Sequence, residues 1–213
     1  MKKITMLSAL LFLSLANAQV PKGTQFVSGQ FGFSMTKDDS NNSSSDSYRF
    51  LPTYGYFFAP NWAVAVSAGY RQTTDHSTTK NANFENLNLE AKSSAFVVTP
   101  SLRKFWVLDE RFSLFCQLDF PLEFGSTKQF LTLESSGVEM NHTKNSFTSY
   151  GINLKPGIDY FVNRRWKIAA SIGEIGYSNV HYKETKFNKS KFNFEANFST
   201  IQFAVKYIIP AKK

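Results

Sequence analysis

The feature that most constrains this 213-residue chain is a two-residue alternation of bulky and small side chains that recurs along its length. In residues 62–70, one face of a strand would carry Trp62, Val64, Val66, Ala68 and Tyr70. The positions between them hold alanine, serine and glycine. Because successive side chains of a β-strand point to opposite faces, this period predicts strands with one bulky face and one small face. No segment shows a convincing helical period, so we expect an all-β chain.

Eight segments show this alternation, and they are residues 24–36, 47–58, 62–73, 93–106, 111–128, 146–161, 165–177 and 193–209. Very short connections follow the second, fourth and sixth segments. Long polar connections follow the other segments, at residues 37–46, 74–92, 129–145 and 178–192, and we expect them to be mobile loops. Strict alternation of tight turns and long loops is typical of outer-membrane barrels. We therefore predict an eight-stranded antiparallel up-and-down transmembrane β-barrel that closes from first strand to last.

The distribution of bulky and charged residues indicates which face meets lipid. A soluble barrel would be apolar inside and heavily charged outside, whereas here the second face is mostly small and uncharged. That face suits a narrow lumen, with the bulky face toward lipid. Aromatic residues near the short turns predict an interfacial girdle on the periplasmic side. Its members are Trp62, Trp106, Phe112, Tyr160, Trp166 and Tyr207. The alternative is a soluble sandwich with tryptophans in its core.

The N-terminal sequence has the pattern of a targeting segment. Lys2 and Lys3 precede an apolar run at residues 4–15, and a small-residue A-x-A site ends at Ala18. This order is typical of a cleaved secretory signal peptide, and the run is shorter than a spanning helix requires. We expect residues 1–18 to be a signal peptide and residues 19–213 to be the barrel domain of the cell outer membrane. The alternative is a short N-terminal membrane anchor.

A repeat with the pattern P-x-x-x-x-F occurs three times, at residues 52–57, 100–105 and 156–161. Proline removes a ladder donor, so we expect these prolines to lie at β-bulges. With the signal peptide, the short turns and the loop alternation, the chain resembles eight-stranded outer-membrane barrels of the OmpX type and the barrel half of OmpA-type proteins. The resemblance implies both termini in the periplasm. The chain departs from the family at its end, where residues 210–213 follow the last alternating segment instead of a terminal aromatic residue.

Charged residues at inward positions suggest what fills the lumen. They are Arg49, Arg103, Asp119, Glu123, Lys155, Asp159, Lys167 and Lys206. An unpaired charge in a water-poor interior costs several kcal/mol, so we expect these side chains to form an ion-pair network that plugs the barrel. Asp119 and Lys155 are predicted to pair. Arg103, Asp159, Lys167 and Lys206 are expected to share a lower level.

The loops carry few signs of chemistry. The three histidines, His76, His142 and His181, fall in predicted loops without metal-ligand spacing, so we expect no metal and no cofactor. Ser178, His181 and Glu184 are close in sequence, but no G-x-S-x-G elbow marks an activated serine. A basic segment of the last loop, with Lys183, Lys186, Lys189 and Lys191, could contact lipopolysaccharide phosphates or simply be solvated.

The sequence therefore predicts a non-enzymatic integral outer-membrane protein, structural or adhesive, that presents loops outside the cell. The alternatives are a passive channel for small solutes and a lipid-modifying enzyme. The formal net charge of +8 suits anionic headgroups better than nucleic acid in an exported protein. We expect outer-membrane lipids, lipopolysaccharide and the barrel-insertion machinery as partners, no nucleic acid, and a monomer.

Overall fold

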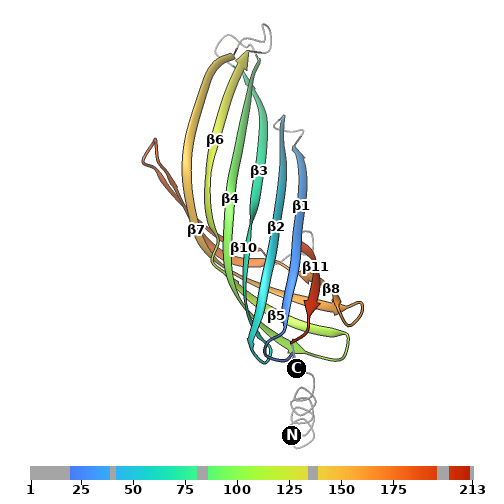
Figure 1. Ribbon diagram of the computed structural model, residues 1–213. Helices are drawn as coiled ribbons and strands as arrows, with labels where there is room; N and C mark the ends of the chain where they lie inside the picture. Colours follow the sequence, from blue (N-terminus) through green and yellow to red (C-terminus); the bar gives the residue numbers. More distant parts are fainter. Residues whose placement is uncertain (1–19, 39–41, 81–85, 134–138, 196–201, 212–213) are drawn as a thin grey trace, which may run out of the picture.

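The computed structural model describes residues 20–38, 42–80, 86–133, 139–195 and 202–211. Strands dominate this part of the chain (Figure 1), and no helix in it is long and apolar enough to cross a membrane. The strands are β1 (Gln25–Asp38), β2 (Ser43–Ala59), β3 (Trp62–Lys80), β4 (Asn86–Val107), β5 (Phe112–Asp119), β6 (Leu122–Leu133), β7 (Glu139–Phe161), β8 (Trp166–Ser171), β9 (Glu174–Tyr182), β10 (Asn188–Glu195) and β11 (Gln202–Ile209). The predicted signal peptide lies outside the described residues.

These eleven elements trace the eight predicted strands. Only Phe120 and Pro121 separate β5 from β6, and both elements pair with β4 and β7. Similarly, β8 and β9 both pair with β7. Each strand is antiparallel to its neighbours, and β1 pairs with β11 from Gln25↔Ile209 to Gly29↔Val205. The prediction of an all-β, antiparallel eight-stranded barrel closing first to last is therefore confirmed.

The strands are longer than the sequence predicted, and the loops correspondingly shorter. The predicted loop 74–92 belongs mostly to β3 and β4, which stay paired up to Lys80↔Asn86. In the same way, β6 and β7 take up much of 129–145, and β9 and β10 much of 178–192. The prediction of long mobile loops is wrong in extent because these segments are mostly polar, and their few apolar residues, such as Leu87 and Leu89 opposite Leu133 and Leu131, form alternations too short to stand out in the sequence. Residues 39–41, 81–85 and 134–138 lie outside the described part.

The interpretation of the repeated prolines as bulges is also wrong for two of them. Pro52 and Pro100 keep one register across both neighbouring strands. Opposite Pro156, the extra residue is in the neighbouring strand, where the register shifts between Gly157↔Ser171 and Leu154↔Ile175. Gly173 lies in this bulge with a φ of 73°, which favours glycine. All three proline side chains are exposed on the outer face, and the strands that carry them have no added residue at the proline.

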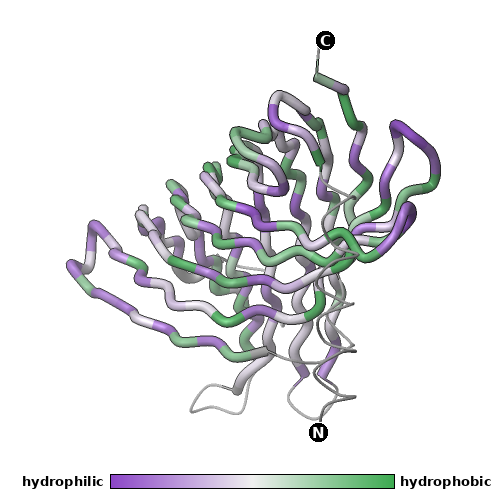
Figure 2. Tube along the Cα trace, turned by 90° about the horizontal axis from the view of Figure 1, so that it is seen from below, coloured by the Kyte–Doolittle hydropathy of each residue, from purple (hydrophilic) through white to green (hydrophobic). Residues whose placement is uncertain are grey.

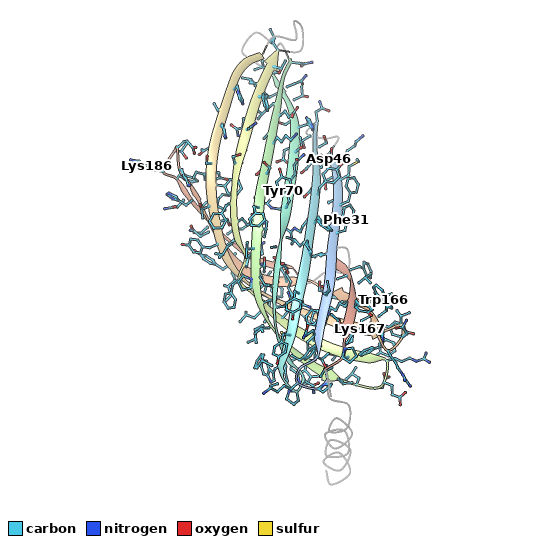
Figure 3. All side chains as sticks on the ribbon, in the orientation of Figure 1. Phe31, Asp46, Tyr70, Trp166, Lys167 and Lys186 are labelled. Atoms are coloured by element: carbon cyan, nitrogen blue, oxygen red, sulfur yellow. The ribbon has the colours of Figure 1, made fainter. Side chains whose placement is uncertain are left out.

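The outer face of the sheet is apolar, and hydrophobic and hydrophilic residues alternate along the strands (Figure 2). Exposed outward side chains include Val27, Phe31, Val66, Phe96 and Ile158. The six residues of the predicted aromatic girdle also lie near the short turns with outward parity. Among them, Phe112 packs on Tyr160 and Trp166 packs on Tyr207, with both pairs of ring centroids 5.0 Å apart. In Figure 3, Trp166 lies toward the end of the molecule where the C-terminus is found in Figure 1.

Candidate functional site: the barrel lumen

A layer of phenylalanine rings forms the floor of the lumen, near the short turns. Phe26, Phe57, Phe105 and Phe115 are each at most 5% exposed. Successive ring centroids in this order are 5.9, 5.2 and 6.0 Å apart, which is within the range of favourable aromatic contacts. Phe57 and Phe105 belong to the P-x-x-x-x-F repeat. Because the proline points outward, a phenylalanine five residues later points inward, so the repeat supplies part of this floor.

A buried carboxylate with two lysines lies against this floor. Asp159 is fully buried, and its Oδ1 and Oδ2 atoms are 2.6 Å from Lys206 Nζ and 3.6 Å from Lys167 Nζ. Lys206 Nζ also lies 4.6 Å from the centroid of the Phe115 ring, and Lys167 Nζ lies 3.8 Å from that of Phe161. Aromatic faces attract cations, so the rings stabilise the positive charge that one carboxylate cannot balance.

Arg103 completes the lower level but lacks a charged partner in contact. It is only 6% exposed, and its guanidinium carbon lies 5.2 Å from the Phe26 ring centroid. Asp159 and Asp119 attract it electrostatically. Within the described part of the chain, however, neither carboxylate comes within 4 Å of it, and its Nε has no hydrogen-bond partner. The structure thus brings the four predicted lower residues together and leaves Arg103 as a buried cation without a contacting acid.

The middle of the lumen holds the pair expected from the sequence. Lys155 Nζ lies 3.4 Å from Asp119 Oδ2 and 3.2 Å from Glu174 Oε2, so one lysine bridges two acids. Gln117 donates a further hydrogen bond to Asp119. Asp119 is 3% exposed, which makes this the better-buried part of the bridge.

At the upper level, Glu123 forms an ion pair as expected for the predicted network, but Arg49 does not. Glu123 accepts a hydrogen bond from Arg71, not from Arg49. Arg49 and Arg71 are direct cross-strand partners on β2 and β3, both pointing inward. Arg71 passes the small side chain of its other cross-strand partner, Ala95, to reach Glu123. Among the described residues, Arg49 has no acid within 4 Å, so two like charges face each other and the one contacting acid, Glu123, binds Arg71 alone.

Arg71 and Glu174 are therefore lumen residues that sequence reasoning missed. Arg71 has the same odd-numbered parity as the inward residues of β3, and extending that alternation by one residue would have found it. Glu174 could not be found in this way. The bulge at Gly173 reverses the parity of the strand, so a position counted as outward points inward.

The basic segment of the last loop does not form one surface. Lys183 and Lys186 lie at the tip between β9 and β10, and Lys186 projects at the end of this hairpin in Figure 3. Lys189 and Lys191 lie within β10, on the face that points to the lumen, opposite Val180 and Ser178. Only the two tip lysines are thus placed to meet lipid phosphates outside the barrel.

The side chains considered for catalysis or metal binding do not converge. The histidines lie on strands β3, β7 and β9, not in loops as predicted. His181 Nδ1 lies 2.7 Å from Asn188 Oδ1, and its strand parity is opposite to that of Ser178. Glu184 instead accepts a hydrogen bond from the Ser146 amide, and this bonding lowers its pKa. No group of three potential metal ligands occurs in the described part of the chain.

Above the phenylalanine floor, the lumen contains a cavity of about 410 Å³. Its lining runs from Arg103 and Lys206 near the floor to Lys191 on β10. The fold and this lumen together define a small membrane barrel with an apolar outer wall, a sealed floor and a charged interior.

Residues 5–208 match the family described as the outer membrane protein beta-barrel domain, and the chain belongs to this family of outer-membrane proteins. Three solved structures are similar to it. Ail, the attachment invasion locus protein of Yersinia pestis, is 16% identical with a TM-score of 0.42, over 88% of this chain and 99% of that chain. Neisserial surface protein A is 13% identical with a TM-score of 0.35, over 86% of this chain and 94% of that chain. Escherichia coli outer membrane protein W is 16% identical with a TM-score of 0.37, over 89% of this chain and 99% of that chain. No curated protein matches the sequence.

Proposed function

We propose that this protein is a non-enzymatic, structural or adhesive component of the outer membrane that presents the outer ends of its strands at the cell surface. Strand length carries the proposal. β4 and β7 have 22 and 23 residues, whereas a transmembrane strand needs about 9–11. Roughly half of each strand therefore extends beyond the bilayer, on the side opposite the short turns. Export would use residues 1–18 as the signal peptide.

The extended part is a continuous sheet. β3, β4, β6 and β7 remain paired there, with Leu87↔Leu133 and Leu131↔Asn141 among the outermost pairs, and Figure 1 shows them rising together. β7 begins at Glu139, but its ladder with β9 begins only at Phe147. The first residues of β7 therefore form a sheet edge within the described structure. Such an edge exposes backbone groups that can pair with a strand of another protein.

The two alternative functions have less support. The sealed floor opposes a passive channel, because an eight-stranded barrel is narrow enough for side chains to fill it. The separation of Ser178 from His181 opposes a serine-dependent lipid-modifying enzyme. Lys183 and Lys186 at the hairpin tip would add contacts to lipopolysaccharide phosphates, which favour cationic side chains.

The experiment removes the β6–β7 part of the extension, which carries the exposed edge of β7, and leaves the barrel. Replacing residues 128–144 with Asn-Gly joins Thr127 to Asn145, which are direct partners, through a two-residue hairpin turn. A matched control replaces residues 182–187 with Asn-Gly between His181 and Asn188, which are also partners. Attachment of bacteria to a surface coated with serum proteins should fall only in the first variant. Heat-modifiable migration on gels reports whether each barrel has folded.

Three results would contradict the proposal. The first is undiminished attachment by bacteria that carry the folded, trimmed barrel. The second is steady conductance of the intact protein in planar bilayers, which would favour the channel. The third is a change in lipid A mass on overexpression that is lost in a Ser178→Ala variant, which would favour the enzyme.

A further inference from the structure

The cavity in the lumen has a marked excess of positive charge. Its described lining includes six cationic side chains, Arg49, Arg71, Arg103, Lys155, Lys191 and Lys206. The acids in the same lining are Asp119, Glu123 and Glu174. Six cations against three acids leave three positive charges around one space in the lumen. Asp159 forms an ion pair with Lys206, one of the six cations, but it also forms one with Lys167.

The excess is concentrated in side chains that have no contacting acid. The ion pairs within the cavity use Lys155 with two of the acids and Arg71 with the third. Within the described residues, this leaves Arg49, Arg103 and Lys191 without an acid inside 4 Å. Lys191 is exposed near the mouth of the cavity, Arg49 is half-buried, and Arg103 is buried. Buried cations without partners are rare because desolvation costs several kcal/mol per ion. Arg103, at 6% exposure and with an unpartnered Nε, is the clearest case.

The cross-strand pair of Arg49 and Arg71 at the upper level is a second sign of unbalanced positive charge. Like charges directly opposite each other on neighbouring strands are destabilising. Arg49 and Arg71 occupy such positions, and Glu123 contacts only Arg71. A negatively charged group between the two guanidinium groups would convert this repulsion into attraction.

We propose that the lumen is a binding site for a small solute that carries phosphate or sulfate groups. Planar guanidinium groups match the oxygen geometry of these groups and bind them through paired hydrogen bonds. The volume, about 410 Å³, is within the range of small-molecule sites. The phenylalanine floor closes the lower end, so the solute enters from the end opposite the short turns. Arg103 and Lys206 bind it at the bottom, and Arg49 and Lys191 bind it nearer the mouth.

The test measures binding of sodium pyrophosphate to the folded full-length barrel in detergent, by isothermal titration calorimetry at constant ionic strength. Arg49→Gln and Arg103→Gln should each weaken binding by roughly tenfold, as expected for the loss of one charge-assisted contact. The matched control is Lys183→Gln, which removes the same charge at the hairpin tip, outside the cavity, and should leave the affinity unchanged. If Arg103→Gln does not fold, Lys191→Gln takes its place.

Two further arms identify the source of the anionic group. Inorganic phosphate should compete with pyrophosphate, whereas lipopolysaccharide in mixed micelles should not, because a lipid headgroup held at the membrane surface cannot reach Arg103. Competition by lipopolysaccharide that depends on Lys183 would place the anion site outside the barrel and overturn the proposal. Equal weakening by all three substitutions, or heats no larger than those of matched sodium chloride, would also overturn it. The variant trimmed at residues 128–144 should still bind pyrophosphate, so this site and the adhesive role fail independently.

Discussion

At the scale of single residues, Asp159 is the carboxylate whose loss should cost the barrel most. Asp159→Ala leaves two buried lysines without an acid, and we expect a loss of about 3–5 kcal/mol in the free energy of unfolding. Asp119→Ala should cost less, because Lys155 keeps Glu174 as a partner. Urea unfolding of the barrel in lipid vesicles, followed by tryptophan fluorescence, measures both values.

Asp75→Ala is the control for this comparison. Asp75 is exposed and bonds Ser45, so its removal should change the free energy of unfolding by no more than about 0.5 kcal/mol. A cost for Asp119→Ala that equals or exceeds the cost for Asp159→Ala would mean that Glu174 does not hold Lys155 in the membrane.

Gly69 is a second residue whose identity has a specific structural reason, because the neighbouring strand leaves no room for a side chain. A Cβ atom at this position would overlap the carbonyl oxygen of Phe50 and lie 3.1 Å from the Cα atom of Leu51. The obstruction is backbone of the neighbouring strand, next to Pro52, so it cannot rotate away. Gly69→Ala should destabilise the barrel by about 1–3 kcal/mol, as overpacking does. The measurement is the urea midpoint.

Gly29→Ala is the matched control, because an added Cβ there meets nothing within 4 Å. The urea midpoint should be nearly unchanged in this variant. Similar midpoints for the two alanine variants would show that β2 does not approach β3 closely at Gly69.

At the scale of strands, the sequence was informative wherever a face met lipid. Alternation identified the inward parity of Asp119 and Lys155, because their neighbours had to be apolar on the other face. Beyond the bilayer the strands are mostly polar, so the same reasoning took the outer parts of β3 and β4 for loops. Hydrogen bonding between the strands maintains the sheet there, together with the half-buried pairs Leu87↔Leu133 and Leu89↔Leu131, and a single sequence carries little signal for strand pairing.

Within a strand, one inserted residue was enough to make the side-chain directions predicted from alternation wrong. The bulge at Gly173 moves Glu174 to the lumen side, where it binds Lys155. The glycine is visible in the sequence, but whether a glycine is a bulge depends on the neighbouring strand. The same limitation affected the repeated prolines, which are placed in regular register at Pro52 and Pro100 and opposite a bulge at Pro156.

The hairpin of β9 and β10 provides a test of orientation. Its tip carries the exposed residues Lys183 and Lys186, whereas Arg164 and Arg165 are exposed in the short turn between β7 and β8. Trypsin added to intact cells should cut at the tip lysines and leave the arginines intact. After the outer membrane is permeabilised, it should cut at both places. Mass spectrometry of the fragments identifies the cleavage sites.

The control for orientation is the double variant Lys183→Gln/Lys186→Gln, in which cleavage of intact cells at the hairpin tip should disappear. Cleavage after Arg164 in intact cells would mean that the short turns face outward. The extended sheet would then lie in the periplasm, and the proposed surface role would be excluded.

At the scale of the whole molecule, the same alternation produces two separate environments. The chain is 19% charged and 42% hydrophobic, which is unremarkable for a soluble protein. The barrel divides these residues so that apolar side chains such as Phe31 and Phe96 face lipid, while the buried charges of Asp159 and Lys206 face each other inside. Overall composition is therefore a poor guide to this fold, and the position of each residue along its strand is a good one.

The phenylalanine floor leads to the last prediction, which concerns permeation. Phe105 lies between Phe57 and Phe115, and this layer seals the lumen, so the intact protein should show no steady conductance in planar bilayers. The double variant Phe57→Ala/Phe105→Ala removes two adjacent rings and should open a small ohmic conductance. Each truncation should cost about 3–5 kcal/mol, so folding is checked by heat-modifiable migration. The control Phe31→Ala/Phe33→Ala removes the same volume from the lipid face and should stay closed. A folded double variant that does not conduct would show that Asp159 and its lysines seal the barrel without the rings.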